Sequence, residues 1–139
     1  AELGHGRLED LRTVEHAGLP RVRVDLVVDE GLVLESGVYG ADALTLWPLC
    51  LEDGPLRALR AVAREAGFAV CAVVHDEREL ERALAIEPEV LVARGRDPRT
   101  LALEPARSER VLRALPVGAG APLPAASGGL SDPEALVRA

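Results

Sequence analysis

Apolar runs alternate along this chain with amphipathic stretches, and the clearest example lies between Phe68 and Thr100. Residues 68–74 form an unbroken apolar run rich in valine, which is typical of a strand covered on both faces. The next stretch repeats leucine and alanine at helical spacing, and a second predicted strand covers residues 89–93, apolar from Val90 onward. This order predicts a strand, a helix and a second strand, the βαβ unit of a parallel sheet.

The same pattern recurs along the whole chain. Strands are predicted to start near residues 21, 42, 68, 89 and 116, and helices over 8–16, 29–38, 53–66, 76–87, 105–115 and after 131. Glycines and prolines between 116 and 129 predict a fifth strand that is short or broken. This regular spacing indicates right-handed βαβ crossovers in one domain over residues 1–139, either an open doubly wound α/β sheet or part of a (β/α)8 barrel.

The composition excludes several function classes. The net charge of −7 argues against nucleic acid or an anionic membrane as partner, because neutralising phosphates needs a net basic face. Cys50 and Cys71 are isolated, which indicates neither a disulfide framework nor a zinc site. Neither a signal peptide nor a membrane span stands out, so we expect a cytoplasmic protein. All sixteen basic residues are arginine, so chemistry that needs a lysine amine is closed to this chain.

Candidate binding residues follow the fourth predicted strand. Arg94 and Arg96 lie in a charged loop at its C-terminal end, the edge where parallel α/β sheets bind ligands. The two arginines are therefore candidates for an anion clamp. The alternative is solvated loop charges that pair with Asp97.

Other polar residues receive structural interpretations. Asp76 with Glu79 three residues later predicts a capping box at the start of a helix. That interpretation leaves His75 as a turn residue rather than a general base. Arg21 and Arg23 are expected to face solvent on the first strand.

Several motifs resemble, in order and spacing, the indole-3-glycerol phosphate synthase family. They are Leu19–Asp25, Gly40–Ala43, Val74–Leu80, Arg96–Asp97 with Thr100, Ser127–Gly128 and Asp132–Glu134. The resemblance implies a (β/α)8 barrel of tryptophan biosynthesis, a lyase that closes an indole ring with loss of carbon dioxide and water. It covers the third to seventh βα units of that barrel, so the implied fold is a partial barrel of about five units.

The same resemblance places the family's acid and base groups on residues that cannot perform their chemistry. Its general-acid lysine lies in an Arg-Lys-Asp run, where this chain has Val24. Three further polar residues of the family are replaced here, a glutamate by Val73, an asparagine by Arg94 and a glutamate by Ala126. General acid–base catalysis typically contributes about 10²- to 10⁴-fold per group, so we expect little turnover and assign no catalytic residue.

The resemblance therefore predicts a catalytically impaired family member that binds a phosphorylated or carboxylated small molecule. Arg96, Ser127 and Gly128 keep the family's binding residues, and Arg94 adds a second guanidinium. The resemblance implies that Ser127 and Gly128 form a phosphate loop, and the alternative is a flexible connector. We expect no cofactor and no metal. A working enzyme on another sugar phosphate is a weaker alternative, because it needs an ionisable group that no motif supplies.

A second function class follows from the partial barrel itself. An open barrel exposes apolar strand edges, which must be covered by a partner protomer, by further chain or by rearrangement into an open sheet. We expect self-association into a homo-oligomer. The alternative function is accordingly a structural or interaction module.

Overall fold

Five parallel strands form one sheet, and their order in space, β1-β2-β3-β4-β5, is also their order in the chain. The strands are β1 (Val22–Arg23), β2 (Ala43–Leu46), β3 (Ala69–Val74), β4 (Val90–Arg94) and β5 (Leu123–Ser127). A doubly wound sheet reverses its strand order at a switch point. The sequential order therefore decides between the two predicted architectures, in favour of a partial barrel-like α/β sheet.

Helices alternate with these strands, as predicted. They are α1 (Asp10–Thr13), α2 (Glu30–Val38), α3 (Asp53–Glu65), α4 (Glu77–Leu84) and α5 (Pro105–Arg113), with short 3-10 turns at Glu15–Ala17 and Pro48–Cys50. The computed structural model describes residues 6–128. The chain divides within β3 into two compact units, Ala1–Cys71 and Ala72–Ala139.

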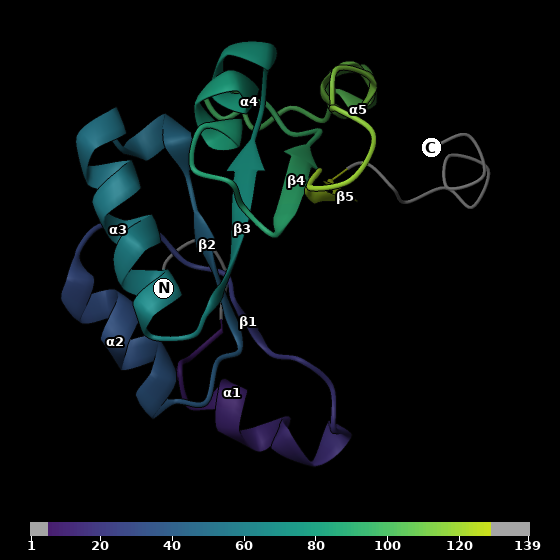
Figure 1. Ribbon diagram of the computed structural model, residues 1–139. Helices are drawn as coiled ribbons and strands as arrows, with labels where there is room; N and C mark the ends of the chain where they lie inside the picture. Colours follow the sequence, from purple (N-terminus) through teal and green to yellow (C-terminus); the bar gives the residue numbers. More distant parts are fainter. Residues whose placement is uncertain (1–5, 129–139) are drawn as a thin grey trace. The chain divides into compact units, whose positions relative to one another are not determined.

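In the first unit, α2 and α3 lie side by side (Figure 1). Asp29 caps α2, because its carboxylate accepts a 2.9 Å hydrogen bond from the Leu32 N–H. Gly37 on α2 faces the Phe68 ring, and a Cβ at this position would lie 3.0 Å from the ring's Cζ. The absence of a side chain at Gly37 thus lets α2 approach the start of β3 closely.

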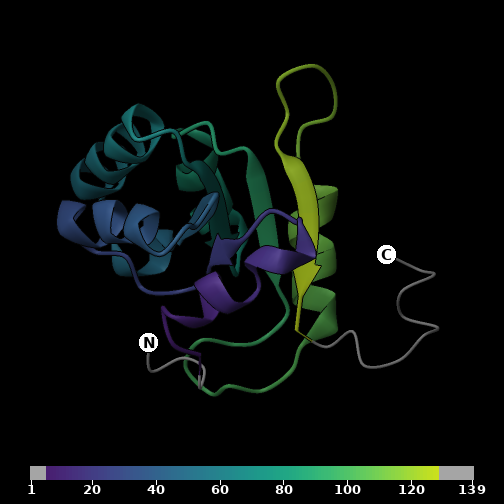
Figure 2. The ribbon, with the colours of Figure 1, turned by 90° about the horizontal axis from the view of Figure 1, so that it is seen from below.

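In the second unit, α4 and α5 pack on one face of the sheet over a core of small and branched apolar residues, Ala72, Val74, Leu80, Ala83, Leu91, Ala93 and Val111. Figure 2 shows α5 running alongside β5. Leu91 and Ala93 are buried in this core, whereas the alternating residues Val90, Val92 and Arg94 are half-buried. Because successive strand residues point to opposite faces, Arg94 projects from the face that α4 and α5 leave uncovered.

Two predicted elements differ from the structure. The fifth strand starts at Leu123 rather than near residue 116, because Gly118 and Gly120 adopt positive φ values of 130° and 86° in the turn before it. The first strand shortens to two residues, although the alternation of buried and exposed side chains continues to Val28. The helix predicted after residue 131 lies outside the described residues.

The prediction that Arg21 and Arg23 face solvent was wrong. Arg23 lies opposite Leu44 in the β1–β2 register, so both side chains project from the same face of the sheet, and Arg23 is only 4% exposed. Arg21 is half-buried and donates to the Leu11 carbonyl at 3.2 Å. An alternating pattern shows that a strand has two faces, but it does not show which face a helix will cover.

Candidate functional site

The C-terminal ends of β4 and β5 bring the four predicted anion-binding residues together. Arg94 and Ser127 are partners in the parallel register, and the Gly95 N–H donates to the Ser127 carbonyl at 2.8 Å. Register partners project from the same face of a sheet, so the guanidinium and the hydroxyl share the face that α4 and α5 leave uncovered. Gly128 then follows Ser127 directly.

Two glycines allow the chain to approach itself closely at this edge. A Cβ built on Gly95 would lie 2.7 Å from the Gly128 carbonyl oxygen, a distance that real side chains do not reach. Gly128 has a φ of 79°, in the left-handed region that favours glycine. The backbone nitrogen of Arg96 lies 3.7 Å from the position of a Cβ on Gly128. The second predicted arginine therefore begins beside the predicted Ser-Gly loop.

A tight loop, residues 96–104, holds the Arg96 side chain. The Nη1 of Arg96 donates to the Leu101 carbonyl, and Arg96 pairs with Leu103 in an isolated antiparallel bridge. The Glu104 N–H donates to the Gly95 carbonyl at 2.6 Å and closes the loop at its base. Leu101 adopts a φ of 60°, which is unusual for a residue with a side chain.

Asp97 organises the tip of this loop. Its Oδ1 accepts hydrogen bonds from the N–H groups of Arg99 and Thr100, each at 2.8 Å, and its carbonyl accepts from the Leu101 N–H at 2.9 Å. The donors at Thr100 and Arg99 hold the pKa of the Asp97 carboxyl below its usual value, with a smaller contribution from the Arg107 charge. Asp97 is therefore an ionised turn-forming residue at neutral pH.

Arg107 on α5 connects the helix to that turn. Its Nη2 lies 2.7 Å from Asp97 Oδ2 and 3.0 Å from Glu104 Oε2. The side chains of Arg107 and Asp97 are only 18% and 17% exposed, so water screens this ion pair less than a surface pair. The sequence interpretation paired Asp97 with Arg94 or Arg96, whereas the structure pairs it with Arg107.

This edge can bind an anion through two kinds of group. The guanidinium groups of Arg94 and Arg96 carry a permanent charge and form bidentate contacts with phosphate or carboxylate. The hydroxyl of Ser127 and the backbone of Gly128 add neutral hydrogen-bonding groups. The structure places these residues together, and their role in anion binding stays a prediction.

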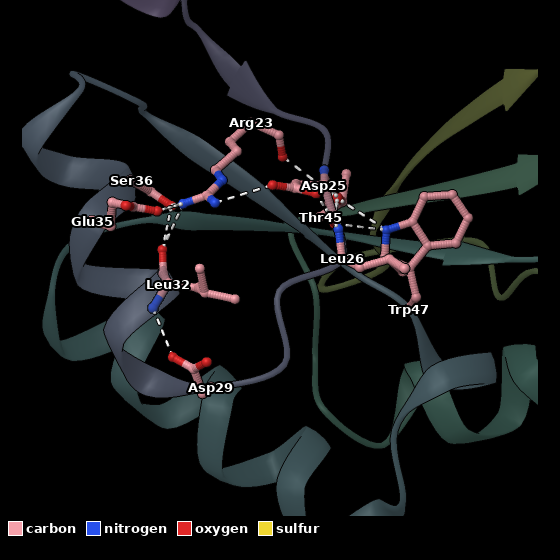
Figure 3. Close-up of polar contacts among 9 residues, drawn as sticks. All are labelled: Arg23, Asp25, Leu26, Asp29, Leu32, Glu35, Ser36, Thr45 and Trp47. Atoms are coloured by element: carbon pink, nitrogen blue, oxygen red, sulfur yellow. Dashed lines mark hydrogen bonds and ion pairs between the residues drawn. The ribbon is translucent and has the colours of Figure 1, made fainter. Parts of the chain in front are cut away.

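The first unit contains a separate polar cluster around Arg23 (Figure 3). The guanidinium points from β1 to α2, where Nη1 donates to the Leu32 carbonyl at 2.9 Å and to Ser36 Oγ at 3.1 Å. Two carboxylates flank it, Glu35 at 3.1 Å and Asp25 at 3.0 Å. These contacts explain how a charged side chain is accommodated at a buried position.

Both the side chain and the backbone of Asp25 form hydrogen bonds. The Thr45 hydroxyl accepts from the Asp25 N–H at 3.1 Å, and the Trp47 Nε1–H donates to the Asp25 carbonyl at 3.1 Å (Figure 3). Burial raises the pKa of the Asp25 carboxyl, but hydrogen bonds from Arg23 and from the Leu26 N–H outweigh it and lower the pKa below its usual value. Asp25 is thus an oriented carboxylate rather than a proton donor at neutral pH.

The predicted capping residue Asp76 is confirmed, because its carboxylate accepts from the Glu79 N–H at 2.8 Å. Glu79 departs from the capping box, in which its carboxylate would return to Asp76. Instead, Glu79 Oε2 accepts from the His75 N–H and lies 2.9 Å from His75 Nδ1. Both side chains are buried, so this pair fixes the imidazole at the end of β3.

Sequence reasoning missed three contributors to these clusters. The close approach at Gly95 and the ion pair of Arg107 join residues from different elements, and no local pattern marks either contact. The turn at Asp97 does carry a local signal, because Asp followed by Pro favours turn initiation.

Neither a metal centre nor a membrane helix is present in residues 6–128. These residues contain no group of three or more His, Cys, Asp or Glu side chains placed to hold a metal ion. The helices described there are too short or too polar to cross a membrane.

Comparison with known proteins identifies relatives of this chain. The family model described as indole-3-glycerol phosphate synthase matches residues 2–136. The chain is 39% identical over 105 residues to the indole-3-glycerol phosphate synthase of Chromobacterium violaceum, an alignment that covers 76% of this chain and 39% of the relative. It is 34% identical over 119 residues to the enzyme of that name from Salinibacter ruber, covering 86% and 43% of the two chains. The chain thus spans about two fifths of the length of these curated relatives.

A solved structure supports the fold. The chain is similar to a crystal structure of a citrate synthase variant, with a TM-score of 0.52 at 13% sequence identity. That similarity covers 83% of this chain and 48% of the other. At this level of identity, the likeness concerns the arrangement of strands and helices.

Proposed function

This chain belongs to the indole-3-glycerol phosphate synthase family, and from that membership we propose that it binds a phosphorylated or carboxylated small molecule without efficient turnover. The observation that supports binding is the pairing of Arg94 with Ser127 at the C-terminal ends of β4 and β5. Arg96 and Gly128 lie directly beside this pair. Charge-assisted hydrogen bonds from guanidinium groups are roughly twice as strong as neutral ones, which suits an anionic ligand.

The proposed loss of turnover rests on the side chains that replace the family's acids and bases. Val24 takes the place of the general-acid lysine, and it is 66% exposed, with neither a proton to donate nor a charge. Val73 takes the place of a glutamate and is buried. Each such group typically contributes about 10²- to 10⁴-fold, so the loss of two or more removes most of the rate enhancement.

A turnover assay tests the impairment. The 139-residue chain is incubated with the carboxyphenylamino-deoxyribulose phosphate substrate of the family, and indole fluorescence is followed beside an intact synthase. We expect no product above about a thousandth of the control rate. Product formation above that level would overturn the impaired assignment and would direct attention to Asp25, Asp97 and His75 as replacement groups.

A binding measurement tests the ligand class. Calorimetric titration with inorganic phosphate and with benzoate should give saturable binding that weakens in Arg94→Gln and Arg96→Gln. Arg113→Gln is the matched control, because this exposed arginine on α5 pairs only with Glu109 among its described contacts. Absence of binding by the wild-type chain, or equal weakening in the control, would contradict the proposal.

A second candidate function is self-association through the edge strand β1 and the segment that follows it, residues 22–28. Every second residue of this segment is apolar and exposed, Val22, Val24, Leu26 and Val28. Exposed apolar rows on an edge strand favour pairing with another chain, here a second copy. Light scattering should show an oligomer that dissociates in Val24→Asp, whereas a monomeric wild-type chain would exclude this candidate.

A further inference from the structure

The Arg96 guanidinium is hydrogen-bonded to its own loop. Its Nη1 donates to the Leu101 carbonyl, and only one of the five guanidinium N–H groups is used in this bond. The direction of the Leu101 carbonyl depends on the backbone of Leu101, whose φ of 60° is sparsely populated for leucine. A backbone conformation of this kind persists only where surrounding contacts determine it.

Those contacts come from Asp97. The Asp97 carbonyl accepts the Leu101 N–H at 2.9 Å, and its N–H donates to the Ala102 carbonyl at 2.9 Å. The Asp97 side chain binds the Thr100 N–H, which immediately precedes Leu101. Asp97 therefore forms hydrogen bonds with Leu101 and with both of its neighbours in the sequence, Thr100 and Ala102.

Arg107 fixes Asp97 in turn. The 2.7 Å contact between Arg107 Nη2 and Asp97 Oδ2 ties the loop to the first turn of α5. The same nitrogen also contacts Glu104 Oε2 at 3.0 Å, at the residue whose N–H closes the loop on Gly95. A continuous series of contacts thus runs from α5 to the Arg96 guanidinium.

We propose that Asp97 and Arg107 are positioning residues that orient the Arg96 guanidinium toward an anion at the β4–β5 edge. This inference rests on the proposed function, because it assigns these residues a role in that same site. It gives Asp97, a negatively charged residue, a favourable effect on the binding of a negatively charged ligand.

The sign of the effect of Asp97 on anion affinity distinguishes a positioning role from long-range electrostatics. Asp97→Asn removes a negative charge near the edge, so long-range electrostatics alone predicts tighter anion binding. The asparagine oxygen still accepts from Arg99 and Thr100, so the turn itself is retained. Positioning predicts the opposite result, a loss of affinity, because the ion pair with Arg107 is lost.

The experiment measures inorganic phosphate affinity by calorimetry for the wild-type chain, Asp97→Asn, Arg107→Met and the double variant. We expect each single variant to weaken binding about five- to tenfold, the size of the net contribution of one typical hydrogen bond. The double variant should be no weaker than Arg107→Met, because the two changes break the same contact between Asp97 and Arg107. Arg107→Lys should restore part of the affinity, and Arg113→Met should change nothing.

A second measurement observes Arg96 directly. The ¹⁵N order parameter of the Arg96 Nε–Hε bond should fall in Asp97→Asn and in Arg107→Met. The backbone spectrum of both variants should keep the chemical-shift dispersion of the folded chain. Tighter or unchanged phosphate binding in Asp97→Asn, with an unchanged Arg96 signal, would overturn the positioning role alone. A wild-type chain that fails to bind phosphate, or whose binding is insensitive to Arg96→Gln, would overturn the proposed site as well.

Discussion

The Arg23 guanidinium lies 3.0 Å from the Asp25 carboxylate, and both side chains project toward the helix-covered face of β1. Exposed ion pairs contribute roughly 0–1 kcal/mol, whereas removal of one partner of a buried pair costs several times more. Arg23 is buried and also holds the Leu32 carbonyl and the Ser36 hydroxyl of α2. The pair therefore links β1 to α2 and is not an exposed surface ion pair.

Replacement of Arg23 should destabilise the chain substantially. We expect Arg23→Leu to lower the free energy of unfolding by about 2–4 kcal/mol, because buried acceptors on α2 lose their donor. Urea denaturation followed by circular dichroism measures this change. Arg113→Leu, which removes an arginine that is 77% exposed, should cost less than about 0.5 kcal/mol. Equal losses of unfolding free energy in the two variants would show that the contacts of Arg23 stabilise the chain no more than those of an exposed arginine.

Asp25 should make stability sensitive to acid. Its pKa in the folded chain lies below the ordinary value of 3.8, so folding stabilises the ionised carboxylate. This contribution is fully present above the ordinary pKa and is lost as the pH falls through the lower, folded-state value. Urea midpoints measured from pH 6 down to pH 2 should fall less steeply below pH 4 in Asp25→Asn than in the wild-type chain. Parallel curves for the two proteins would contradict the assignment.

Gly95 should not tolerate a side chain. A Cβ at Gly95 would lie 2.7 Å from the Gly128 carbonyl oxygen, so Gly95→Ala must push β4 and β5 apart at their C-terminal ends. We expect a loss of about 1–3 kcal/mol in unfolding free energy. The matched control is Gly54→Ala on α3, where nothing lies within 4 Å of the added carbon. This control should raise the free energy of unfolding by up to about 1 kcal/mol. A Gly95→Ala variant as stable as the wild-type chain would refute the close approach.

Leu101 should accept glycine without loss. Its φ of 60° strains a residue with a Cβ, and glycine adopts this conformation freely. Leu101→Gly should keep or raise the free energy of unfolding, by up to about 1 kcal/mol. Leu103→Gly serves as the comparison, because Leu103 is also exposed but has no positive φ. Thermal unfolding should show Leu103→Gly as the less stable variant, and the reverse order would disprove the strain.

Local signals predicted most of the elements. The apolar run before His75, the cap at Asp76 and the amphipathic helix after it all appear as β3 and α4. Such features depend on residues within a few positions of each other, where spacing alone decides the hydrogen bonds and the buried face. The start of β5 was misplaced because the glycine-containing turn before it offers no apolar period to count.

The candidate site was predictable in part. Arg94 was identified because it ends a predicted strand of a parallel sheet, and Ser127 was identified from the Ser-Gly pair of the family resemblance. Their exact register, and the pairing of Asp97 with Arg107, involve residues from separate elements. Sequence spacing does not specify such pairings, since many registers and rotamers satisfy the same hydrophobic pattern.

The sequence by itself determined the repeating strand–helix order, the arginine-only basic chemistry and the motifs that mark the family. Only the tertiary structure decided that the strands follow one another in sequential order and that Arg23 lies inward. It also decided that the 96–104 loop folds around Asp97. The physical reason is that hydrophobic periodicity defines the faces of each element, whereas packing between elements selects which face is covered and which polar groups meet.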